Sequence, residues 1–591
     1  MAAPPSSSVR SWWSRPRWWV AGALVLYLAI CSVLVVRART AAADGADELS
    51  LAREEVDIGD VLDGSASTRL LAARTDFSRA NGLFRNPVLL PLRPLPIIGR
   101  QLRSSVSLTD AGVDVLDVGV AAVDEIRDLV DDAAPQGTER IALLRDLEIV
   151  TADVRAALAD VDLGPASGLI APLADARNEL AGQLADVDQL AADGQVATAG
   201  LADILEGPSS YLVLAANNAE MRSGSGMFLS AGVATFVDGE IEISDFEGTG
   251  DLTLDEGVGL PPELEKLYGW ADPDQEWRSL GLSPRFPVNA EVASRMWTAL
   301  GRLPVDGVLS VDVSALALIL RVTGPVELAD GGTIDADNVL PTLLHDQYAV
   351  IQERDDLNDE NVARQEQLST VAGAVIEALE DPGLDVADLA ETLRAAGSTR
   401  HLFAWSADES QQAVWDALGV DGDLGPESLL VGVANRGGNK LDQYLDVSSR
   451  LELVERSGDE LRMALTVSVT NNAPVDDLPY VIGFDPPDGL GPAGYGGFVT
   501  VSLPAGAREL VAPGATAVAS GPDGPTTHVG LDLMVASGET VDTRLEFVLD
   551  ESRRIVRIEP DARIPAMAWS VPSGESWDDS IGHTVDVSET P

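Results

Sequence analysis

The chain has 591 residues, with 40 Lys and Arg against 95 Asp and Glu, and a formal net charge of −55. Because nucleic acids and anionic membrane surfaces are bound through clustered cations, this charge argues against either as a partner of the folded body. The single cysteine, Cys31, lies in an apolar segment, which excludes disulfides, a cysteine nucleophile and a thiolate metal site from the rest of the chain.

Residues 18–36 contain no charged side chain and, as a helix, would span about 28 Å, close to the roughly 30 Å hydrocarbon core of a bilayer. Arg10, Arg15 and Arg17 precede them, which favours a cytoplasmic N-terminus over residues 1–17. We therefore predict a single-pass anchor in the cytoplasmic membrane at Trp18–Val36, with the bulk of the chain extracytoplasmic. The alternative is a signal peptide cleaved after the alanines at 41–43.

Residues 37–207 show apolar side chains at three- and four-residue spacings, which predict a helical bundle or stalk. The three clearest stripes are Leu116, Val120, Val123, Ile126 and Val130; Leu144, Leu147, Val154, Leu158 and Val161; and Leu173, Leu180, Leu184, Val187 and Leu190. The proline-rich segment NPVLLPLRPLPIIG (86–99) should interrupt the helices. It is a rigid connector, the interpretation we favour, or a membrane-proximal docking loop.

Residues 208–442 mix strand and helix patterns, which predicts a layered α/β core domain. Strands are expected at 211–216, 227–237 and 305–313, with a turn at Asn217-Asn218 and helices at 314–322 and 361–379. Within residues 443–575, large apolar residues stand at every second position in Leu461 to Thr470 and in Val541 to Leu549, and Gly/Pro/Asp turns separate such segments, which predicts a β-sandwich. Residues 576–591 are expected to form a polar tail.

The sequence contains no zinc-protease motif, nucleotide phosphate loop or dinucleotide fingerprint, and its four histidines are not at metal-ligand spacing. In the glycine-rich segment NNAEMRSGSGMF (217–228), Arg222 could clamp a phosphate, or the segment is a hairpin with an exposed arginine. Lys440 is one of two lysines. We expect it to pair with Asp442 or with a carboxylate of the neighbouring domain, rather than with a ligand.

Four segments of the sequence are similar to segments of a known protein family. They are PLRPLPIIGRQLR (91–103), YLVLAANNAEMRSGSGMFLS (211–230), DGVLSVDVSALALILRVTGPVEL (306–328) and GNKLDQYLD (438–446). They resemble an uncharacterised family of actinobacterial membrane-anchored proteins, known as domain of unknown function number 4012. This resemblance brings no established activity.

A more distant resemblance is to LytR-CpsA-Psr proteins, anchored α/β domains that move glycopolymers from a polyprenyl-pyrophosphate carrier onto the cell wall. The residues that show this resemblance are the loop arginine Arg222, the strand at 306–312 and the turn at 324–326, Arg354, and the start of a helix at ARQEQL (363–368). It implies that Arg222, Arg354 and Arg364 grip phosphates, supported by Gln365.

Two departures from that family's pattern stand out. The chain reads Arg222-Ser223-Gly224 where the family has an aspartate after the arginine, and residues 244–251 lack the family's "PRD" element. A Mg²⁺ ion held by Asp245 or Asp251, with Glu247 as a further candidate, would replace the lost positive charge.

Together these features predict an envelope protein that binds a polyprenyl-(pyro)phosphate-linked glycan, its lipid tail near the helix at 315–322. The transfer of a glycosyl phosphate to an envelope acceptor would make it a phosphotransferase, but no catalytic residue is assigned. The alternative is a non-catalytic scaffold that organises envelope partners.

Overall fold

The computed structural model describes residues 15–55, 64–131, 136–328, 332–349, 357–379, 384, 386–487 and 489–589, with the backbone alone at 15–22, 50–55, 131, 357–367 and 386–387. The chain forms two compact units. The first comprises Met1–Asp132 and Asp146–Gln195, and the second comprises Ala133–Arg145 and Val196–Pro591. Each unit is described by itself.

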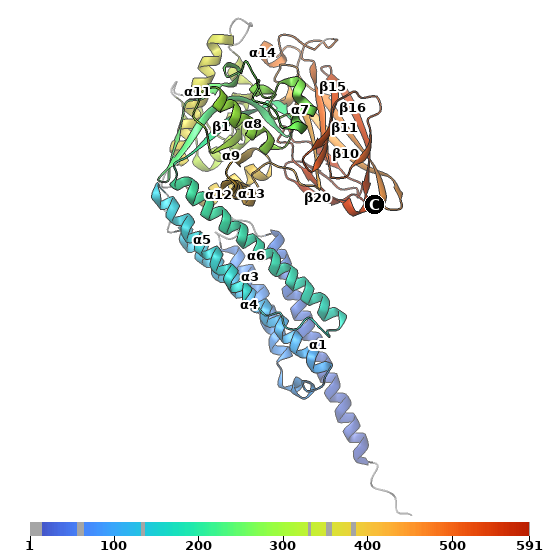
Figure 1. Cartoon of the computed structure of the whole chain (residues 1–591). Helices are drawn as coiled ribbons and strands as arrows, with labels where there is room; N and C mark the ends of the chain where they lie inside the picture. Colours follow the sequence, from blue (N-terminus) through green and yellow to red (C-terminus); the bar gives the residue numbers. More distant parts are fainter. Residues whose placement is uncertain are drawn as a thin grey trace, which may run out of the picture. The chain divides into compact units, whose positions relative to one another are not determined.

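The N-terminal unit is helical, as its apolar periodicity predicts (Figure 1). Its elements are α1 (Arg15–Glu55), α3 (Ser65–Phe84), the 3-10 helix η2 (Pro87–Leu92), α4 (Ile98–Asp131), α5 (Thr138–Ala159) and α6 (Ala171–Glu206), the last two shared with the second unit. The three predicted stripes lie on α4, α5 and α6, except for Val161, which follows the end of α5. The proline-rich segment breaks the helical run between α3 and α4, because proline cannot continue a helix.

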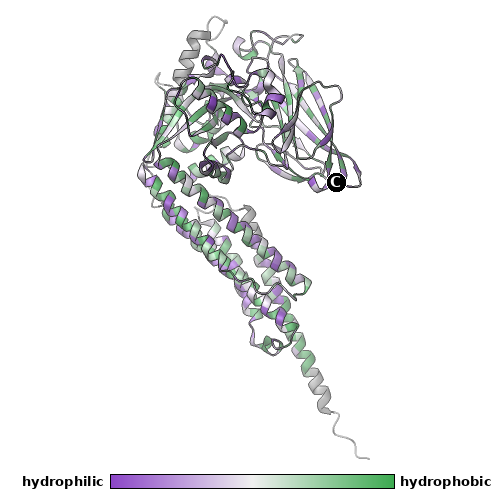
Figure 2. Cartoon of the chain, in the orientation of Figure 1, coloured by the Kyte–Doolittle hydropathy of each residue, from purple (hydrophilic) through white to green (hydrophobic). Residues whose placement is uncertain are grey.

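Helix α1 contains a segment, Ala23–Leu49, that is long and apolar enough to cross a membrane, with a mean hydropathy of 1.8 (Figure 2). Where α1, α3 and α4 pack, the ring of Phe77 fills the space between Gly45 and Gly112. A Cβ atom at Gly45 or Gly112 would come within 2.9 or 2.7 Å of that ring. The two glycines therefore let the three helices approach closely around one aromatic side chain.

The second unit opens with a mixed six-stranded sheet of order β3-β2-β1-β5-β8, with β4 paired to β2. Strand β1 runs parallel to β5 and antiparallel to β2, and β5 is antiparallel to β8. The strands are β1 (Ser209–Arg222), β2 (Ser225–Val237), β3 (Glu240–Ile243), β4 (Glu247–Gly248), β5 (Gly307–Asp312) and β8 (Leu402–Ser406), and β6 (Val326–Glu327) pairs with β7 (Thr333–Ile334) outside the sheet.

Helices cover both faces of this sheet, because side chains along β1 alternate between two cores. Leu212 and Leu214 pack with α8, whereas Val213 packs in a cluster that Leu368 of α11 joins. The helices are α7 (Pro262–Tyr268), α8 (Phe286–Ala299), α9 (Val313–Thr323), α10 (Val339–Leu344), α11 (Leu357–Leu379), α12 (Val386–Ser398) and α13 (Glu409–Leu418), with the 3-10 turns η3 (Thr249–Asp251), η4 (Gly269–Ala271), η5 (Trp277–Ser279) and η6 (Asp346–Tyr348). The predicted layered α/β arrangement is present.

The predicted turn at Asn217-Asn218 is wrong. Strand β1 continues to Arg222 through register shifts near these residues, and the chain turns instead at Ser223 and Gly224, where Gly224 has φ +77°. The amide side chain of Asn217 accepts from the backbone N–H of Ala219 at 2.8 Å, which satisfies the bulged backbone locally.

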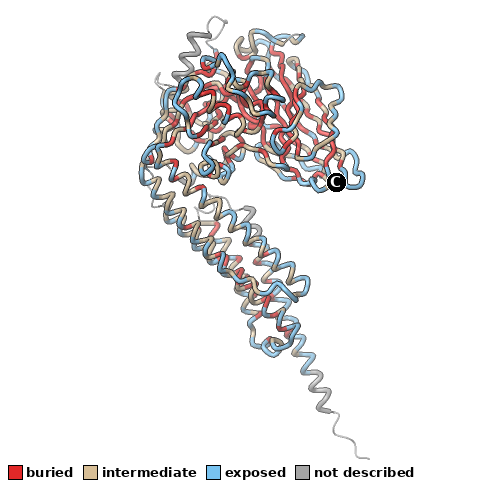
Figure 3. The backbone as a smooth tube through the Cα atoms, viewed as in Figure 1, coloured by how far each residue is buried: buried red, intermediate tan, exposed pale blue. Residues whose placement is uncertain are grey.

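The C-terminal part is strand-rich and builds two further six-stranded sheets, of order β13-β16-β11-β10-β18-β19 and β14-β15-β12-β9-β17-β20. Both sheets contribute to one apolar cluster, which Figure 3 shows as red, buried backbone. The strands are β9 (Ser428–Asn435), β10 (Leu445–Ser457), β11 (Glu460–Asn471), β12 (Tyr495–Leu503), β13 (Arg508–Val511), β14 (Ala517–Asp523), β15 (Thr526–Val535), β16 (Thr540–Asp550), β17 (Ile555–Glu559), β18 (Ala568–Ser570), β19 (Ser576–Asp578) and β20 (His583–Asp586). The short helices are η8 (Asp442–Tyr444), α14 (Pro479–Ile482) and η9 (Glu551–Arg553).

Two boundaries differ from the expected ones. Strand β9 pairs with β12 and β17, so the strand-rich part begins before residue 443. Residues 576–591, expected as a polar tail, contain β19 and β20. Trp577 pairs with Trp569 across β18 and β19, and Val585 and Val587 are buried, which explains why this segment is ordered.

Candidate functional site

A cavity of about 260 Å³ lies beside helix α9 in the second unit, near the lower limit of the roughly 300–1,000 Å³ of small-molecule sites. One part of its wall is apolar, with Ala317 and Leu318 of α9 and Leu340 of α10. The other part carries polar side chains: Ser314, Arg321, Thr399, His401, Arg563, Asp579 and Ser580. The cavity therefore suits a ligand with both an apolar and a polar end.

His401 is held in a fixed orientation by Asp312. Strand β5 ends at this buried aspartate, whose Oδ1 accepts from the N–H of Ala315 and so caps α9. Its Oδ2 accepts from His401 Nδ1 at 2.6 Å and from Asn218 Nδ2 at 2.7 Å. Burial alone would lower the pKa of His401, but the Asp312 carboxylate raises it above the ordinary value. Nε2 is thus the ring nitrogen available to a ligand, and the ring favours its cationic form.

Arg563 and Asp579 also line the cavity, and each is only 4% exposed. The Nη2 of Arg563 donates to the carbonyl of Asp442 at 3.2 Å, whereas its Nη1 is buried without a hydrogen-bond partner. Asp579 Oδ1 accepts from the N–H of Met567 at 2.6 Å, and its Oδ2 has no partner. Since an unpaired buried polar atom costs about 1–3 kcal/mol, these two atoms mark a place where a ligand could complete the hydrogen bonding.

Arg222, the first sequence-predicted phosphate ligand, is not on this cavity wall. It is buried at the end of β1, and its guanidinium donates to three backbone carbonyls: Arg278 at 2.8 Å, Asn435 at 2.7 Å and Met221 at 3.1 Å. Burial lowers its pKa. In this arrangement Arg222 fastens the β1–β2 turn to strand β9.

Lys440 is paired, as expected, with a carboxylate of the preceding domain, and the partner is Glu220 of β1 rather than Asp442. The ammonium lies 4.7 Å from the ring centroid of Tyr348 and 5.2 Å from that of Tyr480. Burial alone would lower the pKa of Lys440, but the Glu220 carboxylate raises it, so the pair is ionised.

The other predicted site residues remain predictions. Arg354 lies outside the described residues, and Arg364 and Gln365 lie in α11 where the backbone alone is described. Asp245 and Asp251 are exposed, one between β3 and β4 and one in η3. Within the part of the chain that the structure describes, no three His, Cys, Asp or Glu side chains form a group that could hold a metal ion.

Sequence reasoning missed His401, Arg563 and Asp579. Asp312 and His401 are 89 residues apart, and Arg563 and Asp579 come from the strand-rich part. No local spacing connects these four residues. The one part of the sequence prediction that points to this cavity is the expectation that a ligand lies near the predicted helix at 314–322.

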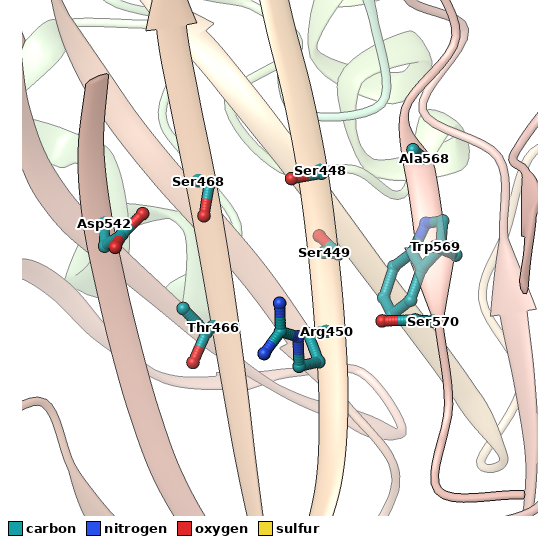
Figure 4. A pocket seen from close by; sticks show the side chains of 9 residues that line it. All are labelled: Ser448, Ser449, Arg450, Thr466, Ser468, Asp542, Ala568, Trp569 and Ser570. Atoms are coloured by element: carbon teal, nitrogen blue, oxygen red, sulfur yellow. The ribbon is translucent and has the colours of Figure 1, made fainter. Parts of the chain in front are cut away.

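A second hollow, of about 280 Å³, lies on the sheet formed by β16, β11, β10 and β18 (Figure 4). Two rows of residues cross these strands in register, and all of them except Ala568 have polar side chains. One row is Asp542, Ser468, Ser448 and Ala568, and the other is Thr466, Arg450 and Ser570. Figure 4 shows their hydroxyl, carboxylate and guanidinium groups around one space. Such a set of donors and acceptors matches a polyhydroxylated ligand.

The cavity and this hollow adjoin along the chain. Ala566 lines the cavity and Ala568 lines the hollow, so they lie at most about 7 Å apart. Between them, the N–H of Met567 is hydrogen-bonded to Asp579. The backbone from Ala566 to Ala568 therefore contributes to the walls of both places.

Residues 206–348 match the model of a family described as "Protein of unknown function (DUF4012)", so the chain carries a domain of this family. The match includes β1, β5, Asp312 and the α9 and α10 walls of the cavity, but not His401, Arg563 or Asp579. No curated protein and no solved structure matches the chain.

Proposed function

We propose that this chain, which carries a DUF4012 domain, is a single-pass envelope protein with a cytoplasmic N-terminus that binds a polyprenyl-phosphate-linked glycan outside the membrane. The observation that carries the proposal is the buried, unpartnered Nη1 of Arg563 on the wall of a cavity that also presents His401. A phosphate oxygen is the natural acceptor for a guanidinium and an imidazolium together.

The remaining surfaces of the cavity fit the other parts of such a ligand. Ala317, Leu318 and Leu340 would contact the first isoprene units, and the hydroxyl-lined hollow on β10 and β11 would contact the sugar. In this proposal Arg563 and His401 take the phosphate role that the LytR-CpsA-Psr resemblance gave to Arg222, because Nε and Nη1 of Arg222 already donate to backbone carbonyls.

The finer architecture is part of the same proposal. The apolar cluster shared by the two C-terminal sheets supports a β-sandwich, and the mixed sheet with helices on both faces supports a LytR-CpsA-Psr-like core. If the protein also transfers the glycan, His401 would be the general acid that gives its Nε2 proton to the leaving phosphate, since Asp312 holds Nδ1 and so orients the ring. Binding alone does not require that step.

Arg321 provides the test, because it lines the cavity but is exposed, so its replacement leaves no buried hole. For the full chain in nanodiscs, Arg321→Gln is expected to weaken binding of farnesyl phosphate by roughly 5–10-fold, about 1 kcal/mol, through the loss of one charge-assisted contact. Calorimetric titration would measure this. Mass spectrometry of lipids that co-purify with the wild-type chain would identify the natural ligand.

Arg394→Gln is the matched control, because Arg394 is an exposed arginine on α12 outside the cavity wall. It is expected to bind as tightly as the wild type. Equal affinities for all three proteins, or no measurable binding and no co-purified lipid, would favour a non-catalytic scaffold instead.

A further inference from the structure

The turn between α3 and α4 packs beside the apolar helix α1, within the N-terminal unit. The hydroxyl of Tyr27 donates to the carbonyl of Val88 at 2.8 Å, and Cys31 Sγ lies 4.0 Å from the same oxygen. Leu89 is fully buried in a cluster that includes Cys31 and Ala38 of α1. The turn, drawn in blue in Figure 1, is therefore fixed to the segment that is apolar enough to cross a membrane.

The opposite side of this turn is apolar and uncovered. Val88, Leu90, Leu95, Ile97 and Ile98 are 37, 49, 43, 73 and 45% exposed. Five exposed large apolar side chains thus lie within 11 residues, whereas single exposed apolar residues are ordinary on protein surfaces. Such apolar side chains are more stable among the acyl chains next to α1 than in water.

The charge of the turn is opposite to that of the rest of the chain. Residues 77–109 contain five arginines and no acidic residue, in a sequence with 95 Asp and Glu. Arg85 pairs with Asp110, whereas none of the described carboxylates forms an ion pair with Arg93, Arg100 or Arg103. Anionic lipid headgroups would provide the missing counter-charges, because the negative surface potential of a membrane attracts basic side chains next to it.

The depth of the contact on α1 agrees with this interpretation. If the hydrocarbon core ends at Val36, then Tyr27, Cys31 and Leu34 lie about 14, 8 and 3 Å inside it, at 1.5 Å per residue. All three belong to the cluster that holds the turn. Interfacial protein elements bury their apolar face about 5–10 Å into the boundary between headgroups and acyl chains, and Cys31 lies within this range.

We infer that residues 86–98 form a second membrane contact, inserted in the leaflet from which Arg37 emerges, with Arg93 and the following Arg100 and Arg103 on anionic phospholipid headgroups. This inference rests on the membrane anchoring in the proposed function, but not on ligand binding. Residues 86–98, which we call the wedge, then give the anchor a second contact with the membrane beside helix α1. The helical unit therefore cannot rotate freely about a single span.

Site-specific fluorescence of the full chain tests the inference. In a Cys31→Ala background, single cysteines from Val33→Cys, Ile97→Cys and Leu190→Cys would each carry a nitrobenzoxadiazole label. The three positions are exposed in the structure, so the label displaces no packed side chain. The protein would be reconstituted in phosphatidylcholine–phosphatidylglycerol vesicles, with and without a lipid spin-labelled high on its acyl chain.

Labels at 33 and 97 are expected to emit at shorter wavelength and to lose most of their intensity to the spin-labelled lipid, whereas the label at 190 keeps its intensity. If 97 behaves like 190 while 33 is quenched, the wedge is wrong and the anchor stands. If 33 is not quenched either, the anchoring itself fails, and the wedge fails with it. Omitting phosphatidylglycerol should reduce quenching at 97, and unchanged quenching would overturn the headgroup contact.

Discussion

Lys440→Met is expected to destabilise the second unit by about 3–5 kcal/mol, the cost of leaving one partner of a buried ion pair without its counter-charge. Lys440 is 1% exposed and Glu220 9% exposed, and their side chains form an ion pair between β1 and the segment after β9. Without the ammonium, the Glu220 carboxylate must remain charged in an apolar setting or take up a proton. Urea unfolding of the full chain in detergent, followed by near-ultraviolet circular dichroism, would measure the loss.

The double variant Glu220→Gln with Lys440→Met should recover most of that stability, because no charge is then left inside. Arg74→Met is the exposed counterpart: Arg74 pairs with Asp117 on the helical unit, and both side chains are well exposed, so its loss should cost far less than the loss of Lys440. A Lys440→Met variant no less stable than Arg74→Met, or a double variant no better than the single one, would contradict the assignment.

The elements that the sequence predicts well are those whose pattern is local. Leu461, Met463 and Leu465 stand at every second position and are buried on one face of β11. This apolar period of two was enough to predict the strand. Strand β9 was not among the predicted strands, and its residues lay within the range 208–442 assigned to the α/β core. All eight of its residues are buried, and a run without alternation is equally typical of a strand in an α/β core.

The candidate site was harder to predict because its contacts are long-range. Arg222 was recognised as an arginine in a glycine-rich turn, but its role depends on the carbonyl of Asn435, 213 residues later. The Asp312–His401 pair and the Arg563 donor come together only when β5, β8 and the strand-rich part assemble. The same applies to Asn218, whose amide binds Asp312 instead of forming the predicted turn.

Asp579→Asn is expected to stabilise the second unit near pH 7 and to have little effect near pH 4. Burial raises the pKa of Asp579 from its ordinary 3.8 to about 6. A carboxyl group with a raised folded-state pKa contributes stability below the unfolded pKa and loses it as the pH rises through 6. The shift corresponds to about 3 kcal/mol of penalty at neutral pH, which an asparagine does not incur.

The net gain should be smaller, about 1–2 kcal/mol, because the new amide N–H₂ is buried where Asp579 Oδ2 had no partner. The amide oxygen can still accept from the N–H of Met567, so the backbone contact is kept. Thermal unfolding of both proteins between pH 4 and pH 8 would show two curves that cross near pH 5, with Asp579→Asn the more stable protein above that pH and slightly the less stable below it.

Asp477→Asn is the control with the opposite sign. Burial alone would raise the pKa of Asp477, but hydrogen bonds from Tyr444 and His345 lower it below the ordinary value. Its carboxylate therefore contributes stability above the unfolded pKa, and Asp477→Asn should destabilise the protein at pH 7. If Asp579→Asn were destabilising at pH 7 as well, Asp579 would already be satisfied as an anion. The unpartnered Oδ2 would then not mark a ligand site.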